Sequence, residues 1–314
     1  MSIVAAGMVL CGSNNVFDVE CSDGIIRRCS IKGKKLKDSG GNTTGYYNPL
    51  APGDTVDIES ASPDDFQAQI RALRPRKNAF VRWNLKGRAP QILAANVDYV
   101  VLVTTPDEPP FRPRFIDRAL VQAEHDGVTP LIASNKCDLP FSAGMEERLS
   151  LWQSLGYRTL RASAKSGAGL AELKEILSGK LSVFAGQSGV GKSSLINALG
   201  TARSQKTGKL SEKYNRGNHT TSKGVLLRLG DMAIIDTPGV RRFIPFGIEP
   251  GELAWYFPEM RPLAGQCAFG LSCSHTVETG CAVLEALKAG RLDKERYESW
   301  RRMYAGLETG DWGD

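Results

Sequence analysis

The chain has 314 residues, which is enough for about two average domains or three small ones. Hydrophobic residues make up 41% and charged residues 24%, an ordinary globular composition that excludes the collagen, coiled-coil and low-complexity classes. No apolar run approaches the length of a membrane-spanning helix, and the N-terminus lacks the features of an export signal, so we expect a cytoplasmic protein without membrane contact. The net charge of +6 favours an anionic partner without identifying it.

Residues 1–88 contain short apolar stretches separated by Gly, Asn and Pro, with no long helical period. Short strands with turn signals predict a small antiparallel barrel or sandwich. Basic residues cluster within 27–37 and 71–82. A five-stranded barrel with a basic face is a common platform for single strands or RNA, and the alternative is an ordinary solvated strand surface.

Residues 89–243 alternate apolar runs with helical stretches, which predicts a mainly parallel sheet covered on both faces. The expected strands are 97–104, 130–134, 158–163, 181–186, 224–229 and 233–236, and the expected helices are 115–125, 145–155, 170–177 and 192–199. Residues 244–314 form a third part with a Cys/His cluster, helices expected over 283–289 and 294–306, and a tail, 311–314, that we expect to be frayed.

The phosphate-loop pattern GxxxxGKS occurs at Gly186–Ser193, between an expected strand and an expected helix. Its glycines let successive N–H groups face a phosphate, and the helix N-terminus adds partial positive charge. Lys192 is expected to reach the β- and γ-phosphates and to assist catalysis, and Ser193 to bind Mg²⁺. The expected phosphate-binding residues are Gly186, Gln187, Ser188, Gly189, Val190, Gly191, Lys192, Ser193 and Ser194.

An Asp-Thr-Pro-Gly sequence follows the expected strand 233–236. Asp236 at the strand end can hold Mg²⁺, usually through water, and Gly239 can present its N–H to the γ-phosphate. Alone the sequence would indicate only a turn. Its position about 44 residues after Lys192 makes it the second metal-side element of the same site.

Two further strand-end sequences predict selection of guanine. Asn135, Lys136, Cys137 and Asp138 follow one strand, and the carboxylate of Asp138 can accept hydrogen bonds from N1 and N2 of guanine, a donor pair that adenine lacks. The sequence Ser163-Ala164-Lys165 follows the next strand and is expected to pack against the base from the other side. In isolation the first sequence could equally be a polar turn, and the second is a weak motif.

The order of these elements differs from that of ordinary GTPases, in which the phosphate loop comes first. Here the guanine elements precede Gly186–Ser193, and Asp236–Gly239 comes last. This is a circular permutation, which an α/β domain tolerates because its termini usually lie close together. The segment that senses the γ-phosphate therefore leads directly into the third part of the chain.

Three of the seven cysteines lie within 15 residues of one another near the C-terminus and enclose one of the three histidines. Cys267, Cys273, His275 and Cys281 have the donor set of a closed, tetrahedral Zn²⁺ site, which would be structural, with one zinc per chain. The alternative is four buried residues without a metal.

These features together resemble the RsgA (YjeQ) family of circularly permuted ribosome-assembly GTPases over nearly the whole chain, including Arg76–Val103 and Gly217–Thr221. The resemblance implies three domains: an OB-fold RNA-binding domain (1–88), a permuted GTPase domain (89–243) and a mainly helical zinc domain (244–314). It also implies GTP and GDP as ligands, and maturation of the small ribosomal subunit through its rRNA. The spacing from Cys267 to Cys273 is one residue longer than is usual in the family.

Two features bear on hydrolysis. Val240 stands where many GTPases have a water-orienting Gln, so intrinsic hydrolysis should be slow. The basic segment 203–228 is expected to be a mobile switch loop in which Thr220 or Thr221 binds Mg²⁺. The resemblance implies that the neighbouring His219 takes part in catalysis; the alternative is that it only contacts phosphate or RNA. We expect a monomeric GTPase stimulated by the ribosome. The alternatives are a GTP-binding RNA scaffold with negligible hydrolysis and a signalling GTPase.

Overall fold

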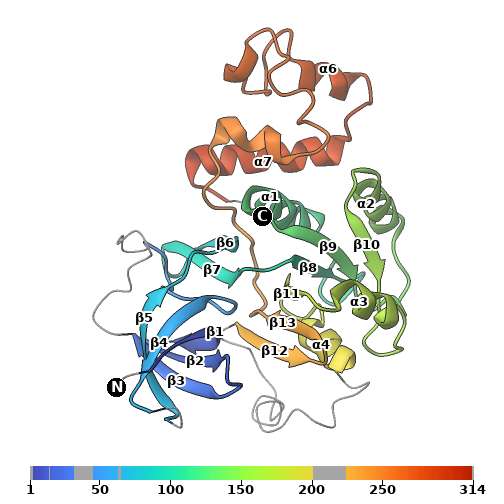
Figure 1. Ribbon diagram of the computed structural model, residues 1–314. Coiled ribbons are helices and arrows are strands. Elements are labelled where there is room, and N and C mark those ends of the chain that lie inside the picture. Colours follow the sequence, from blue (N-terminus) through green and yellow to red (C-terminus); the bar gives the residue numbers. More distant parts are fainter. Residues whose placement is uncertain (1–2, 14, 32–44, 63–64, 201–223, 313–314) are drawn as a thin grey trace.

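The chain folds into a barrel, a central α/β unit and a C-terminal helical unit, seen in a computed structural model (Figure 1). The structure describes residues 3–13, 15–31, 45–62, 65–200 and 224–312. Within these ranges, no helix is both long enough and apolar enough to cross a membrane.

Five strands form a closed barrel in the order β1-β2-β3-β5-β4, with β3 and β5 parallel and the other pairs antiparallel. Buried side chains alternate along these strands, as a barrel with one face inside requires. The expected OB-type barrel is confirmed. Its strands are β1 (Ile3–Ser13), β2 (Val16–Cys21), β3 (Ile26–Ile31), β4 (Thr55–Ser60) and β5 (Gln67–Leu73).

A hairpin of β6 (Ala79–Asn84) and β7 (Ala89–Ala95) lies between the barrel and the central sheet (Figure 1). The domain boundary expected between residues 88 and 89 falls within this hairpin. The two strands therefore pair although the sequence assigned them to different domains. Phe80 of β6 stacks on Phe243, the last residue of the expected GTPase domain, with ring centroids 5.4 Å apart. The hairpin therefore holds the chain where it leaves the central unit.

The central sheet has the strand order β10-β9-β8-β11-β13-β12, and every pair is parallel except β12 with β13. The mainly parallel sheet expected from the alternating pattern is thus confirmed. Its strands are β8 (Tyr99–Thr104), β9 (Thr129–Ser134), β10 (Arg158–Arg161), β11 (Leu181–Gly186), β12 (Val225–Leu229) and β13 (Met232–Asp236).

Helices cover both faces of this sheet, which explains why the strands are continuously apolar. On β8, Val100 and Leu102 pack beneath one helix pair, while Val101 and Val103 pack beneath the other. The first pair is α1 (Pro113–Asp126) and α2 (Ala143–Ser154), and the second is α3 (Leu170–Leu177) and α4 (Lys192–Gly200).

The C-terminal unit is mainly helical, as expected, and rests on α1 (Figure 1). Its own apolar core includes three of the clustered cysteines and the side chain of Val121 from α1. Its elements are the 3-10 helices η1 (Pro250–Tyr256) and η2 (Gly270–Ser272) and the α-helices α6 (Ala282–Lys288) and α7 (Lys294–Thr309).

The expectation of a frayed tail is wrong for residues 311 and 312. Gly310 adopts a left-handed conformation that ends α7 and turns the chain back. Trp312 is then buried, with the guanidinium of Arg118 5.5 Å from its ring centroid. Arg242 donates a hydrogen bond of 3.0 Å to the Trp312 carbonyl, so the tail is held beside the exit from the central unit.

Candidate nucleotide site and metal centre

The predicted nucleotide-binding sequences meet at one edge of the central sheet. From β8 the chain winds outward to β9 and β10, then crosses back to β11 and β13 on the other side. The carboxyl ends of β8 and β11 are therefore the topological switch point, where open α/β sheets bind ligands. The phosphate loop follows β11 there, and Asn135 and Ser163 follow β9 and β10 at the same edge.

The phosphate loop needs glycine where other segments approach its backbone. Gly191 has a φ of 85°, and an added Cβ would lie 2.4 Å from the Asn135 Nδ2 atom. Gly239 packs so closely on the loop that its added Cβ would lie 2.6 Å from the Ser188 Cα atom. The Asp-Thr-Pro-Gly sequence thus lies directly against the phosphate loop, as the sequence suggested.

Lys192 occupies the centre of the loop and is buried. Its Nζ donates to the carbonyls of Gly186 at 3.1 Å and Gln187 at 3.0 Å. Burial lowers the pKa of Lys192 to about 8, although the nearby Asp236 opposes the shift. A buried ammonium whose described hydrogen-bond partners are neutral carbonyls can donate charge-assisted hydrogen bonds to a phosphate anion.

Removal of the Lys192 ammonium should sharply reduce nucleotide affinity. Hydrogen bonds to charged groups contribute about 1.5–3 kcal/mol each, so two phosphate contacts predict about a 100-fold or larger loss for Lys192→Ala. Equilibrium titration with fluorescent GDP measures it. Lys180→Ala is the matched control, because Lys180 is exposed at the opposite end of β11. Equal affinities in the two variants would show that Lys192 does not bind the nucleotide.

The residues present fit a Mg²⁺ ion. The Ser193 hydroxyl donates to Asp236 Oδ2 at 2.8 Å, which brings the two expected ligands together. Burial raises the pKa of Asp236, opposed by the Ser193 hydrogen bond and the charge of Lys192. Its second oxygen, Oδ1, is buried and has no hydrogen-bond partner among the described residues. Mg²⁺ prefers oxygen ligands, and a carboxylate oxygen without a hydrogen-bond partner is available to bind it.

The two guanine elements are joined by side-chain hydrogen bonds. Asn135 Nδ2 donates to the Val190 carbonyl at 2.9 Å, and Asn135 Oδ1 accepts from the Ala164 N–H at 3.2 Å. Asn135 is therefore a connector between the phosphate loop and the Ser163–Lys165 element, a role that its sequence position alone did not reveal.

Asp138 is exposed at the same edge, and its carboxylate accepts from the Ser163 hydroxyl at 2.6 Å. This hydrogen bond lowers the pKa of Asp138, so the group is ionised at neutral pH. Ser163 also accepts the N–H of Lys165 at 3.2 Å. An oriented, accessible carboxylate beside a phosphate loop can accept hydrogen bonds from the N1–H and N2–H groups of guanine.

Val240 is partly buried against the apolar core, and its N–H donates to the Gly186 carbonyl at 3.3 Å. The side chain of valine has no polar group, so it cannot orient water. The other residues expected to act in hydrolysis, His219, Thr220 and Thr221, lie outside the described residues.

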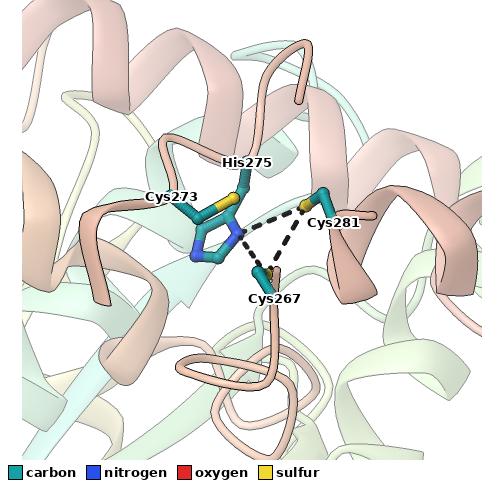
Figure 2. Close-up of side chains that lie close together, drawn as sticks. All are labelled: Cys267, Cys273, His275 and Cys281. Carbon is teal, nitrogen blue, oxygen red and sulfur yellow. Dashed lines mark hydrogen bonds between the residues drawn. The ribbon is translucent and has the colours of Figure 1, made fainter. Parts of the chain in front are cut away.

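The Cys/His cluster brings together Cys267, the loop that contains Cys273 and His275, and Cys281 at the start of α6 (Figure 2). Its four ligand atoms all lie within 4.8 Å of one another, and the four residues are buried. The Nδ1 atom of His275 lies 3.4 Å from the sulfurs of Cys267 and Cys281, which are 3.8 Å apart. The short η2 helix lies between Cys267 and Cys273, and the longer spacing between these cysteines does not prevent the four ligand atoms from meeting.

These distances fit tetrahedral zinc. With Zn–S near 2.3 Å and Zn–N near 2.0–2.1 Å, a tetrahedron has S···S edges of about 3.8 Å and S···N edges of about 3.6 Å. The Ala282 N–H donates to Cys267 Sγ at 3.3 Å, and Tyr297 donates to the His275 carbonyl at 2.9 Å. Such outer contacts hold the ligands in place. A zinc ion held by all four residues would have no open position for catalysis.

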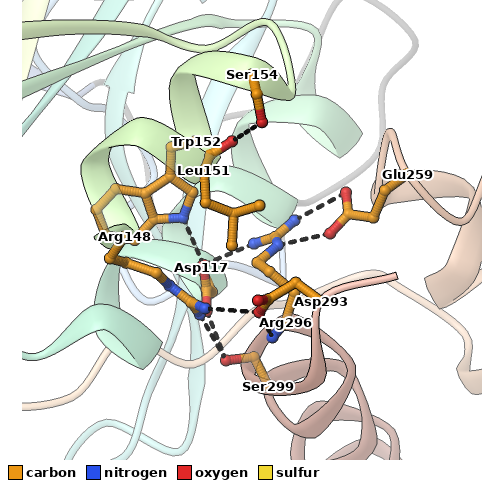
Figure 3. Close-up of polar contacts among 9 residues, drawn as sticks. All are labelled: Asp117, Arg148, Leu151, Trp152, Ser154, Glu259, Asp293, Arg296 and Ser299. Carbon is orange, nitrogen blue, oxygen red and sulfur yellow. Dashed lines mark hydrogen bonds and ion pairs between the residues drawn. The ribbon is translucent and has the colours of Figure 1, made fainter. Parts of the chain in front are cut away.

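A buried ionic cluster fixes the C-terminal unit to the central unit (Figure 3). Asp117 of α1 is completely buried and accepts from Arg296 at 2.6 Å and Ser299 at 2.5 Å, both on α7. Arg148 and Trp152 of α2 donate to the same carboxylate. One carboxylate thus joins three helices, although nothing in the local sequence indicates it.

Most described basic residues of the barrel and its exit are paired. Ion pairs join Arg27 to Asp23, Arg71 to Glu59, Arg74 to Asp57, Arg76 to Asp54 and Lys77 to Asp98. Arg28 is exposed and has no ion pair within the described ranges. The lysines between 32 and 37 lie outside these ranges. The basic face expected from composition is therefore largely neutralised where the structure describes it.

Comparison with known proteins agrees with this arrangement. A family model described as RsgA GTPase matches residues 73–244. The chain is 37% identical over 316 residues to the small ribosomal subunit biogenesis GTPase RsgA of Chlorobaculum parvum, covering 98% of this chain and all of that protein. The chain belongs to the RsgA GTPase family. The RsgA of Porphyromonas gingivalis is 40% identical over 306 residues, covering 94% of each protein.

Two solved structures share the fold. YjeQ from Thermotoga maritima superimposes with a TM-score of 0.72 at 32% identity, covering 98% of this chain and 99% of that one. YloQ, described as a circularly permuted GTPase, gives a TM-score of 0.68 at 25% identity, covering 98% and 96%. The permuted order expected from the sequence is therefore confirmed, and so is the family.

Proposed function

We propose that this RsgA-family chain is a cytoplasmic, monomeric GTPase that binds GTP with Mg²⁺, hydrolyses it to GDP and phosphate, and assists late maturation of the small ribosomal subunit through rRNA. The observation that carries the nucleotide part is the meeting of Asp138, Asn135 and the phosphate loop at the switch point of the sheet. The ribosomal part is supported by the relatives, which are named small ribosomal subunit biogenesis GTPases. The Cys/His cluster supports a structural zinc ion.

In this mechanism Lys192 neutralises the β- and γ-phosphates. Ser193 and Asp236 would hold a Mg²⁺ ion, which would supply further positive charge to the transferred phosphoryl group. The N–H of Gly239 lies beside the loop and can donate to the γ-phosphate. Thr220 or Thr221 would supply a further Mg²⁺ ligand, and His219 takes part in hydrolysis when the chain is bound to the small subunit.

Base selection tests the nucleotide part. Asp138→Asn replaces the acceptor for guanine N1 and N2 with an amide, so the variant should prefer xanthine, whose N1–C2 edge presents a carbonyl. Competition between GTP and XTP for the purified protein measures this change. Asp231→Asn, an exposed turn residue at the opposite edge of the sheet, should keep the preference for GTP. A variant at Asp138 that still prefers GTP would contradict the assignment.

Catalysis by His219 is tested separately from binding. His219→Ala should lose most of the hydrolysis that small subunits stimulate, while GTP affinity and subunit association stay nearly unchanged. The measurement is single-turnover GTP hydrolysis on saturating small ribosomal subunits. Stimulation in the natural protein should also fall steeply with salt, because contacts to RNA phosphates release counterions. Equal rates for both proteins would show that another group is catalytic.

A GTP-binding RNA scaffold with negligible hydrolysis is the second candidate, and the apolar Val240 favours it. The same experiment separates the two. Turnover that stays negligible on saturating subunits supports the scaffold, and strong stimulation supports the enzyme.

A further inference from the structure

The loop between β8 and α1, residues 105–112, has no part in the site described so far. It leaves β8 at the carboxyl edge of the sheet, and β8 is the direct neighbour of β11. The topology therefore places this loop beside the phosphate loop. The ring of Pro109 lies 3.4 Å from the position that a Cβ on Gly189 would occupy. The two loops are thus in contact.

Hydrogen bonds within the loop fix its backbone. The buried Thr105 hydroxyl donates to the Asp107 carbonyl at 3.0 Å. The Asp107 carboxylate accepts the Glu108 N–H at 2.8 Å. Glu108 has a φ of 48°, a left-handed conformation that a non-glycine residue adopts only when its surroundings hold it. The Asp107 hydrogen bond fixes the peptide group that precedes Glu108.

The carbonyl of Glu108 accepts a hydrogen bond from Lys136 Nζ. Lys136 also has a left-handed backbone, with a φ of 61°, and lies between Asn135, which binds the phosphate loop, and the exposed Asp138. Lys136 therefore links two segments: its backbone is part of the guanine element, and its ammonium group binds the 105–112 loop.

We propose that residues 105–109 form a third element of the guanine site, beside residues 135–138 and 163–165. In this arrangement Asp107 is a positioning residue that acts through the Glu108 carbonyl on Lys136. The lysine stem is held in one conformation before the nucleotide arrives, with its methylene groups available to the face of the base. Binding then does not have to order this side chain, which increases affinity by preorganisation. The inference rests on the proposed nucleotide site.

The test measures binding of fluorescent mant-GDP to the full chain. Asp107→Ala removes the acceptor for the Glu108 N–H and should weaken binding by about three- to tenfold, the effect of losing one hydrogen bond. Competition with GTP should show the same loss, because the loop acts on the base rather than on the γ-phosphate. Asp107→Asn keeps a side-chain oxygen acceptor and should restore most of the affinity.

A double-mutant cycle separates positioning from a general structural effect. If Asp107 acts through Lys136, then Asp107→Ala should weaken binding in the natural chain but add almost nothing in a Lys136→Ala background. A loss that persists undiminished in the Lys136→Ala background, or the absence of a loss in the natural chain, would overturn the proposal. Thermal unfolding of each variant identifies a change in stability of the whole domain.

The result also distinguishes this inference from the proposed function. If the natural chain fails to bind mant-GDP, the nucleotide site itself is wrong. If it binds and Asp138→Asn changes its base preference while Asp107→Ala is neutral, only the role of the loop is wrong. Asp231→Ala is the control for removal of an exposed aspartate far from the site.

Discussion

Purified protein should contain about one zinc ion per chain, and Cys273→Ser should lose it together with the fold around α6. The C-terminal core includes Cys267, Cys273 and Cys281 themselves, so without metal this small core would bury unpaired thiols in place of a bonded centre. Structural zinc contributes about 10 kcal/mol or more to folding in small domains. We therefore expect local unfolding rather than a modest loss of stability.

Elemental analysis and hydrogen exchange measure these two effects. In the Cys273→Ser chain, amides of residues 267–292 should exchange rapidly, while those of the central sheet stay protected. Cys11→Ala is the control, because Cys11 is a buried cysteine of the barrel and should not affect the zinc content. A natural protein that is folded but free of zinc would disprove the assignment.

Asp117→Ala should destabilise the contact between the central and C-terminal units by about 3–5 kcal/mol, the usual cost of removing one partner from a buried ionic cluster. The variant leaves Arg148 and Arg296 buried without their shared carboxylate. Burial alone would raise the pKa of Asp117, but the charges of Arg296 and Arg148 outweigh it and hold the pKa below its usual value. The stabilisation is therefore present at neutral pH and is lost only in acid, as the carboxylate is protonated.

Urea denaturation followed by tryptophan fluorescence measures this loss, because Trp152 donates to Asp117 and Trp300 lies on α7. Glu298→Ala is the matched control: Glu298 also pairs with two arginines, Arg301 and Arg302, but at the surface. Exposed pairs contribute about 0–1 kcal/mol, so this variant should unfold near the natural midpoint. Similar midpoints for both variants would show that the cluster does not hold the units together.

Much of the site could be predicted from the sequence because each element is local. Gly186–Ser193 is one turn between a strand and a helix, so its spacing alone dictates which groups face a phosphate. Asn135–Asp138 and Asp236–Gly239 each follow an apolar strand, and strand ends of a parallel sheet meet at one edge. The four zinc donors share a short stretch of chain, which limits their separation. The long apolar runs likewise predicted a sheet covered on both faces.

Contacts between distant segments could not be predicted in the same way. The bond from Arg296 to Asp117 spans 179 positions, and its strength depends on three helices converging on one buried carboxylate. The pairing of Arg71 and Arg74 with acids of β4 depends on barrel register, so these basic residues, although clustered in the sequence, are neutralised in the described part of the barrel. The hydrogen bond between Lys136 and the 105–112 loop requires β8 and β9 to be neighbours in the sheet.

The sequence by itself determined the type of chemistry: the phosphate loop, the guanine elements, the permuted order and the zinc donors all follow from residue types at fixed local spacing. The tertiary structure alone decided how the units are joined, which charges are neutralised, and that Trp312 packs against Arg118 rather than extending into solvent. The physical reason is that backbone geometry limits the relative positions of residues that are close in the sequence. Burial and pairing of charges, by contrast, depend on which distant segments pack against them.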